Sequence, residues 1–208
     1  MASFEDLSKQ VIAGNLVKVK EVTQSLIDGG SSPLDVINLG LIAGMNIVGS
    51  RFKNGEMFVP EVLMAAKSMS AGIEIVKPLI AENDMPSIGK VILGTVKGDL
   101  HDIGKNLVGM MLESGGFTVV NLGIDISPEQ FVKAVKEHKP DIVAMSALLT
   151  TTMLHMKDTI ELIKEEGLNV KVIVGGAPIS QDFADEIGAD GFAPDAASAV
   201  DLCKKLLS

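Results

Sequence analysis

The chain has 208 residues, of which 47% are hydrophobic, enough for one large buried core or two smaller ones. Its formal net charge of −9 and its lack of Trp and Tyr argue against a general nucleic-acid binder, because phosphates are met by clustered Lys and Arg. The single cysteine, Cys203, excludes an internal disulfide and any zinc or iron–sulfur site made of cysteines alone. We therefore expect a cytoplasmic protein.

No segment of the sequence indicates export or membrane insertion. The first six residues have neither the basic start nor the apolar core of a signal peptide. The longest uncharged stretches, residues 36–50 and 142–156, contain polar residues and fall short of the roughly 20 apolar residues that span a bilayer. Both are predicted to lie in a protein core.

The first half of the sequence has helical periodicity. Apolar residues recur at helical spacing from about residue 3 to residue 83, and Gly, Asn and Pro residues mark the breaks. Helices are predicted over residues 4–12, 15–28, 33–52 and 59–82. We expect residues 1–86 to form a four-helix cap domain.

After a polar segment at residues 82–87, which we interpret as a linker, short β-branched runs alternate with helical patterns. This alternation predicts a Rossmann-like (flavodoxin-like) α/β domain over residues 87–208, with a parallel sheet covered by helices on both faces. The predicted strands are 90–96, 118–122, 141–146, 170–174 and 191–193, and the predicted helices are 103–114, 128–138, 153–166, 180–187 and 195–207.

The loop after the first predicted strand, residues 97–106, contains Asp99 and His101. Ligands of such sheets bind at the carboxyl ends of strands, and a carboxylate that holds one imidazole nitrogen fixes the tautomer of a metal-bound histidine. Simpler interpretations of the same loop remain open. His101 could be a loop histidine beside aspartates that cap the next helix, or it could act as a general base.

The rest of the sequence narrows the kind of metal site. His138 and His155 fall in predicted helices without ligand spacing, whereas a zinc site would need three or four ligands. No Ser or Cys stands in a recognisable nucleophile motif, so we predict no catalytic residue. A single histidine suits a metal whose other ligands come from an organic ring.

Three segments resemble cobalamin-binding domains. Residues 99–104, Asp-Leu-His-Asp-Ile-Gly, match the signature D-x-H-x-x-G; residues 146–152 are similar to the S-x-L element of that family, and residues 175–178 to its glycine pair. The three matches occur in the family's order, each at the end of a predicted strand. The resemblance implies a cobalamin or related corrinoid as cofactor.

The resemblance also implies roles for individual residues. His101 would bind cobalt as the lower axial ligand, Asp99 would hydrogen-bond His101, and Thr152 would extend this relay where methionine synthases typically have Ser. The residues implied to contact the corrinoid or its nucleotide tail are Gly98, Asp99, Leu100, His101, Asp102, Ile103, Gly104, Ser146, Leu148, Thr150, Thr152, Gly175 and Gly176.

The helical half resembles the cap of methionine synthase and of corrinoid proteins of anaerobic methyltransferase systems, particularly over residues 44–66. In that family the cap covers the upper corrin face and shields the methyl–cobalt bond. Phe58, Leu63 and Met64 are the candidates for this contact, although packing within a helix bundle explains them equally well.

The family resemblance implies a corrinoid-dependent methyl carrier, a non-catalytic subunit of a multi-component methyltransferase. A substrate-specific methyltransferase would load the methyl group onto Co(I), and a second methyltransferase would pass it to a folate or thiol; a reductive activator would be a third partner. The cap would have to move in each cycle, with a hinge near residues 83–87.

Other functions use the same kind of sheet domain. The small subunit of an adenosylcobalamin-dependent mutase and a corrinoid-binding sensor or regulatory module remain as alternatives, and a receiver-type or flavin-binding domain is a more distant one. The sequence does not identify the methyl donor, because donor choice would reside in the loading partner.

Overall fold

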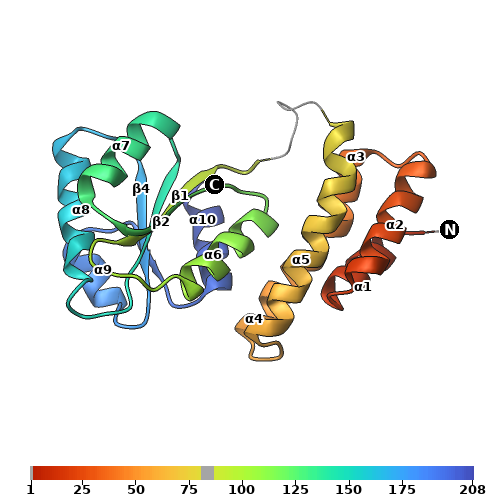
Figure 1. Ribbon diagram of the computed structural model, residues 1–208, viewed down its shortest axis with the longest axis horizontal. Coiled ribbons are helices and arrows are strands. Elements are labelled where there is room, and N and C mark those ends of the chain that lie inside the picture. Colours follow the sequence, from red (N-terminus) through yellow and green to blue (C-terminus); the bar gives the residue numbers. More distant parts are fainter. Residues whose placement is uncertain (1, 81–86) are drawn as a thin grey trace. The chain divides into compact units, whose positions relative to one another are not determined.

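The structure is a computed structural model that describes residues 2–80 and 87–208. The chain divides into two compact units (Figure 1). The first, here called the helical unit, comprises the chain up to Ser87 together with Ser114–Gly116. The second, the sheet unit, comprises Ile88–Glu113 and Phe117–Ser208.

The helical unit follows the predicted helices closely. It contains α1 (Phe4–Ile12), α2 (Leu16–Asp28), the consecutive segments α3 (Pro33–Asp35), η1 (Val36–Ile42, a π-helix) and α4 (Ala43–Lys53), then α5 (Val59–Val76) and the 3₁₀ turn η2 (Lys77–Leu79). The last helix is shorter than predicted, because its α-helical part ends at Val76. Most of the predicted linker and hinge lies outside the described residues.

Local sequence signals explain how these helices begin and pack. The hydroxyl of Ser3 accepts a hydrogen bond from the Asp6 amide (3.1 Å), and the Asp6 carboxylate accepts one from the Ser3 amide (3.2 Å), which forms a capping box. Gly40 and Gly44 let α1 approach closely, because a Cβ on either would lie within 3 Å of Leu7 or Val11. This close packing buries the apolar face of α1.

Among the described helices, the continuous helix over Pro33–Lys53 is long and apolar enough to span a membrane. In its most apolar stretch 39% of the residues are buried, and the core helix of a soluble protein can have the same length and composition. Val36, Ile37, Leu41, Met45 and Val48 are buried. The predicted core role of residues 36–50 therefore accounts for this helix's composition.

The sheet unit has five parallel strands in the order β2-β1-β3-β4-β5. The strands are β1 (Lys90–Val96), β2 (Thr118–Ile126), β3 (Ile142–Ser146), β4 (Lys171–Gly175) and β5 (Gly191–Ala193). The helices are α6 (Ile103–Ser114), α7 (Pro128–His138), α8 (Leu154–Glu165), α9 (Gln181–Ile187) and α10 (Ala196–Leu206). The predicted fold class is confirmed.

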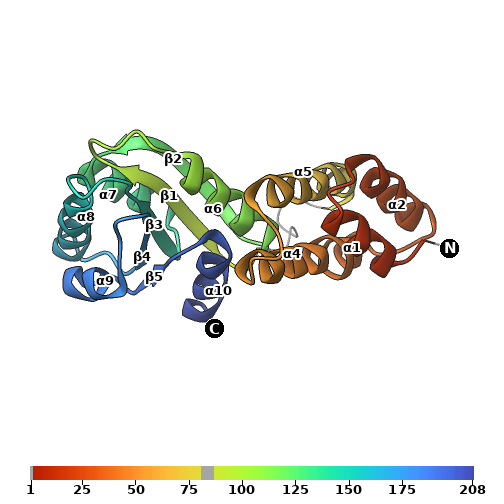
Figure 2. The same ribbon diagram turned by 90° about the horizontal axis from the view of Figure 1, so that it is seen from below.

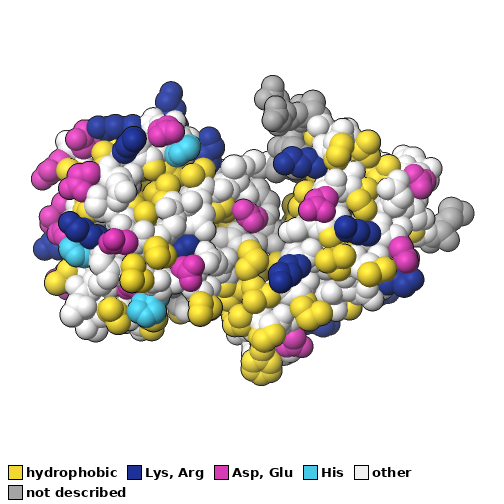
Figure 3. All heavy atoms as spheres, viewed as in Figure 1, with side chains coloured by type: hydrophobic (Ala, Val, Ile, Leu, Met, Phe, Trp, Pro, Cys, Tyr) yellow, Lys and Arg dark blue, Asp and Glu magenta, His cyan; other side chains and the backbone are white. Residues whose placement is uncertain are grey.

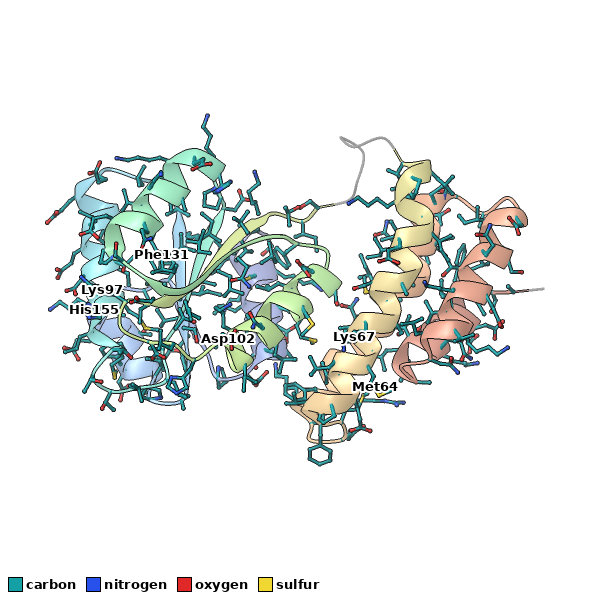
Figure 4. The ribbon with its side chains drawn as sticks, viewed as in Figure 1. Met64, Lys67, Lys97, Asp102, Phe131 and His155 are labelled. Atoms are coloured by element: carbon teal, nitrogen blue, oxygen red, sulfur yellow. The ribbon has the colours of Figure 1, made fainter. Side chains whose placement is uncertain are left out.

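Helices cover both faces of this sheet. Figures 1 and 2 show α7, α8 and α9 on one face and α6 and α10 on the other. Phe131 extends from α7 against the sheet and is fully buried (Figure 4). It occupies the space above Gly94 of β1, where a Cβ would come within 2.7 Å of the ring. Apolar burial of this kind supplies most of the stabilising free energy of such a layered domain.

Strand β2 differs from its prediction. It continues four residues beyond the predicted end at residue 122 and pairs with β1 through two register shifts, so that Gly94 pairs with Gly123 and Val96 with Ile126. Such bulges bend a strand and re-aim its side chains. The extra residues include Asp125, which faces the loop that carries His101.

Candidate functional site

The topology brings the motif-bearing loops to one edge of the sheet. The chain leaves β1 toward β2 on one side and later returns to β3 on the other, so the loops after β1 and β3 flank a switch point. Thr95 pairs with Ser146, and Ser146 pairs with Gly175, so β1, β3 and β4 end at the same level. The three segments that resemble cobalamin-binding motifs are therefore neighbours in space.

His101 and Asp99 form the pair that the sequence predicted. Nδ1 of His101 lies 2.8 Å from Oδ1 of Asp99, and the backbone amide of His101 donates to the same oxygen at 3.1 Å. Because a carboxylate only accepts hydrogen bonds, Nδ1 carries the hydrogen that lies between the two groups. The hydrogen bond fixes the orientation of the ring and leaves Nε2 as the nitrogen that a ligand could use.

The second oxygen of Asp99 is held by the β3–α8 segment. Oδ2 accepts hydrogen bonds from the Leu148 amide (2.7 Å), the Thr152 hydroxyl (2.7 Å) and, more weakly, the Leu149 amide (3.4 Å). Asp99 is fully buried. Burial by itself raises the pKa of this carboxyl, but the hydrogen bonds from Leu148, Thr152 and His101 outweigh it and hold the pKa well below its ordinary range. Asp99 is therefore an anion at neutral pH.

Thr152, which the resemblance implied as an extension of the Asp99–His101 pair, therefore contacts Asp99. Thr152 is buried, and its hydroxyl also lies 3.0 Å from the carbonyl oxygen of Leu149. The hydroxyl has one hydrogen, which can serve only one of the two acceptors at a time, and the ionised carboxylate is the stronger acceptor. A Thr in place of Ser keeps this hydrogen bond.

The ring of His101 is open to a ligand. Its side chain is 53% exposed, and within the described residues Nε2 has no hydrogen-bond partner. The neighbouring loops expose large apolar side chains, with Leu100 66% and Ile103 82% exposed. Leu148 and Leu149 are exposed as well. An exposed nitrogen surrounded by apolar surface fits a large flat ring that carries a metal at its centre, so the donor set suits a corrinoid.

Gly175 and Gly176 meet neighbouring backbone. A Cβ on Gly175 would lie 2.9 Å from the carbonyl oxygen of Ala193, and one on Gly176 would lie 1.8 Å from that of Ala147. Gly176 also has φ +128, a conformation that other residues rarely adopt. The close approach of the strand ends therefore requires glycine at 176 whether or not a nucleotide tail lies nearby.

The start of α6 contains a polar network that sequence inspection did not single out. Buried Lys105 donates from Nζ to Oδ1 of Asn106 (2.6 Å) and of Asn121 (2.9 Å), and Asn106 donates to the carboxylate of Asp102 at 2.9 Å. Burial lowers the pKa of Lys105, partly offset by the charge of Asp102. Asp102, at the entry to α6 (Figure 4), is thus tied to β2 through this network.

The remaining predicted contacts lie at two places. Gly104 is exposed at the first turn of α6, and Ser146 and Thr150 lie at and after the end of β3. Phe58 and Met64 of the helical unit are exposed, at 68% and 57%, and Leu63 is half-buried; Met64 lies on α5 (Figure 4). The contact of these three residues with a corrin face stays a prediction.

The described residues offer no alternative metal site, since they contain no group of three or more His, Cys, Asp or Glu side chains that could hold a metal ion. His155 does form a second pair with a carboxylate, with Nδ1 3.0 Å from Asp158. Both residues of that pair lie on α8, within the helix predicted over residues 153–166. Figure 3 shows charged side chains of both signs mixed over α7 and α8, with no basic stripe on the face drawn.

Comparison with known families explains this arrangement. A family model described as the B12 binding domain matches residues 89–201, and a second model with the same description matches residues 3–77. The chain belongs to the B12-binding corrinoid proteins. The family resemblance read from three motifs is confirmed, and so is a corrinoid as the cofactor of this corrinoid protein.

Its relatives cover its whole length. It is 45% identical over 212 residues to a corrinoid protein of Desulfitobacterium hafniense, spanning 100% of this chain and 98% of the relative. It is 44% identical over 212 residues to dimethylamine corrinoid protein 1 of Methanosarcina acetivorans, spanning 99% of this chain and 100% of the relative.

Solved structures of cobalamin-dependent proteins have the same fold as this chain. A chain in the methanol:cobalamin methyltransferase complex of Methanosarcina barkeri matches with a TM-score of 0.89 and 32% identity, covering 98% of this corrinoid protein and 79% of that chain. A cobalamin-binding protein of Desulfitobacterium hafniense matches with a TM-score of 0.84 and 32% identity, covering 99% of each.

Proposed function

We propose that this corrinoid protein is a methyl carrier, with His101 as the lower axial ligand to cobalt. The observation that carries the proposal is the His101 ring, whose side chain is 53% exposed and whose Nδ1 is held by the buried anion of Asp99. A bound corrinoid supplies a cobalt centre that can accept and release a methyl group. The protein's own task is to bind the ring, fix its lower ligand and exclude competing ligands.

Asp99 holds His101 independently of any bond to a metal. A carboxylate on Nδ1 fixes the tautomer of the ring and keeps the ring in place. This hydrogen bond does not involve Nε2, so it can persist whether or not Nε2 binds a metal. His101 can therefore stay ordered in both situations, which suits a carrier whose metal would change its coordination in each cycle.

The names of relatives point to the partners. The similar proteins include a dimethylamine corrinoid protein and a trimethylamine corrinoid protein of Methanosarcina species. One of the similar structures is a methanol:cobalamin methyltransferase complex. We propose a substrate-specific methyltransferase as the loading partner, with a methylamine as the favoured donor. We further propose that a second methyltransferase transfers the methyl group to a folate or thiol, and that a reductive activator is a third partner. The protein would carry out this work in the cytoplasm.

The first experiment tests corrinoid binding. The purified protein is incubated with hydroxocobalamin, freed of unbound corrinoid by gel filtration, and compared with His101→Ala and His155→Ala variants. The His155 variant is a matched control, because it also removes a histidine whose Nδ1 is paired with a carboxylate. We expect the wild type and the control to retain cobalt stoichiometrically with a histidine-ligated spectrum, and His101→Ala to lose that spectrum. Equal spectra in all three proteins would contradict the assignment.

A second experiment tests carriage. The loaded, reduced protein is incubated with a dimethylamine methyltransferase and dimethylamine labelled in its methyl groups, and label on this protein is measured after separation. Transfer of label to the wild type, but not to His101→Ala, is expected. Retention of corrinoid with no label from dimethylamine or from other methylated donors would argue for a sensor module or a mutase subunit, which share the sheet domain.

A further inference from the structure

The bulged end of β2 holds a residue in an unusual backbone conformation. Asp125 has φ +55, and the described chain contains one other non-glycine residue with positive φ, Lys139. The left-handed region disfavours most L-residues but is tolerated by Asp and Asn. Because the strain must be compensated by local contacts, the partners of Asp125 indicate what it does.

Asp125 contacts the backbone on both sides of the Asp99 residue. Its Oδ1 accepts a hydrogen bond from the Gly98 amide at 2.7 Å, and its own amide donates to the carbonyl oxygen of Asp99 at 3.1 Å. The Asp99 amide in turn donates to the carbonyl oxygen of Val96 (3.1 Å), which closes a turn with Gly98 at φ +77. Asp125 thus holds the peptide group that precedes Gly98 and the one that follows Asp99, the residue that orients His101.

We propose that Asp125 is a positioning residue for the axial histidine, acting through the backbone of Asp99. This inference rests on the proposed function and adds a residue to the site. The side chain of Asp99 is held by Leu148 and Thr152, in the segment between β3 and α8. Its backbone is held by Asp125 of β2. Because β2 and β3 lie on opposite sides of β1, the two sets of hydrogen bonds fix Asp99 in both position and direction.

The β2 register makes this contact possible. Between Gly94 and Val96 of β1, the partner strand advances by three residues instead of two, from Gly123 to Ile126. A regular ladder would keep Asp125 within the strand, where its amide would serve strand pairing. The bulge frees both its amide and its carboxylate for the His101 loop.

The test compares Asp125→Gly with Lys139→Gly in the full-length protein. Both substitutions place glycine at a left-handed position, which relieves backbone strain, but only the first removes a hydrogen bond to the His101 loop. In the corrinoid-free proteins, ¹⁵N NMR reports the tautomer of His101, and hydrogen exchange reports the opening of the Gly98 amide.

In the wild type and in Lys139→Gly we expect one dominant tautomer, with the hydrogen on Nδ1. In Asp125→Gly we expect a mixture of tautomers and Gly98 exchange that is about tenfold faster, as expected for the loss of one hydrogen bond to a charged group. Asp125→Asn keeps an acceptor oxygen and tolerates the left-handed conformation, so it should return both readouts to within about twofold of the wild type.

Two results would overturn the proposal: an Asp125→Gly variant that matches Lys139→Gly in both readouts, or an Asp125→Asn variant as impaired as Asp125→Gly. Because both readouts are made without corrinoid, they are independent of the carrier function. Loss of corrinoid by the wild type would contradict the proposed function, while the NMR and exchange data would still decide the role of Asp125.

Discussion

At the residue scale, Asp99 is the centre of the site. It receives hydrogen bonds from the ring and amide of His101 on one oxygen and from the β3–α8 segment on the other. Its buried charge is stabilised entirely by these donors, so the loss of any one leaves part of the carboxylate desolvated without compensation. Substitutions around Asp99 should therefore affect stability even in the absence of corrinoid.

The Thr152 hydroxyl provides a direct measure of this effect. We expect Thr152→Val to lower the free energy of unfolding by about 1–3 kcal/mol, because it removes a donor from a buried carboxylate at nearly constant side-chain volume. Thr152→Ser, which keeps the hydroxyl, should stay within about 1 kcal/mol of the wild type. Urea unfolding of the three corrinoid-free proteins measures the difference, and a larger loss in Thr152→Ser than in Thr152→Val would show that the methyl group, not the hydroxyl, matters.

The low pKa of Asp99 makes stability depend on pH in a defined direction. A carboxyl whose pKa is lower in the folded than in the unfolded state stabilises the fold above its ordinary pKa, and this contribution is lost as the pH falls through the folded-state pKa. We expect the wild type to be more stable than Asp99→Asn at pH 7 and the difference to shrink below about pH 4. Unfolding midpoints of both proteins measured from pH 7 to pH 3 test this, and a constant difference would contradict it.

At the scale of the elements, strand ends and helix starts hold the loops. Gly176 permits β3 and β4 to end side by side, and the Lys105 network joins the first turn of α6 to β2. Neither feature contacts the predicted metal ligand directly.

Gly176 can be compared with a glycine that also has a positive φ but has no close neighbour. Gly167 has φ +64, and a Cβ added there would meet nothing within 4 Å, whereas a Cβ on Gly176 would overlap the Ala147 carbonyl oxygen. We expect Gly167→Ala to cost about 1 kcal/mol of unfolding free energy and Gly176→Ala at least about 3 kcal/mol. Chemical denaturation of the two variants measures these losses of unfolding free energy. Similar losses in both variants would mean that β3 and β4 can separate easily.

Lys105 is buried with two amide oxygens as partners. Lys105→Met keeps the length of the side chain but leaves the oxygens of Asn106 and Asn121 without this donor, so we expect a loss of about 1–3 kcal/mol of unfolding free energy. Removing an exposed lysine such as Lys18, which pairs with Glu21 on α2, should change stability by less than about 1 kcal/mol. Comparable thermal unfolding midpoints for the two variants would contradict a structural role for the network.

At the scale of the whole molecule, the His101 network is contained within one unit. His101, Asp99, Thr152 and Asp125 all belong to the sheet unit, which has its own apolar core around Ile92, Phe131, Val143 and Met156. A domain with its own core can fold alone.

A fragment of residues 87–208 should therefore fold and retain hydroxocobalamin with a histidine-ligated spectrum. Circular dichroism and gel filtration test folding, and the visible spectrum tests ligation, with the full-length protein as reference. A folded fragment that fails to retain corrinoid would show that the helical unit is required for binding.

The thiol of Cys203 offers a check on the folding of α10. The thiol is buried, and burial raises its pKa to about 12. It should therefore react with a thiol reagent at pH 8 only when α10 opens.

Much of this architecture follows from local sequence. Hydrophobic periodicity predicted the helices of the helical unit and the five strands of the sheet unit, because burial of one face imposes the period of each element. The segments around His101, Ser146 and Gly175 were recognised because they resemble the motifs of cobalamin-binding domains, and parallel strands place their carboxyl ends at one edge. The sequence by itself therefore determined the fold class, the corrinoid family and the Asp99–His101 pair.

Other features depend on contacts between distant segments. The extension of β2 to Ile126 was missed because Gly123 interrupts its β pattern, and only pairing with β1 through two register shifts shows that the strand continues. Lys105 and Asn121 are ordinary polar residues in the sequence and become partners only when α6 packs on β2. Register, bulges and buried polar pairs arise from long-range packing, which no local pattern encodes, and these contacts decided how Asp99 and Asp125 hold His101.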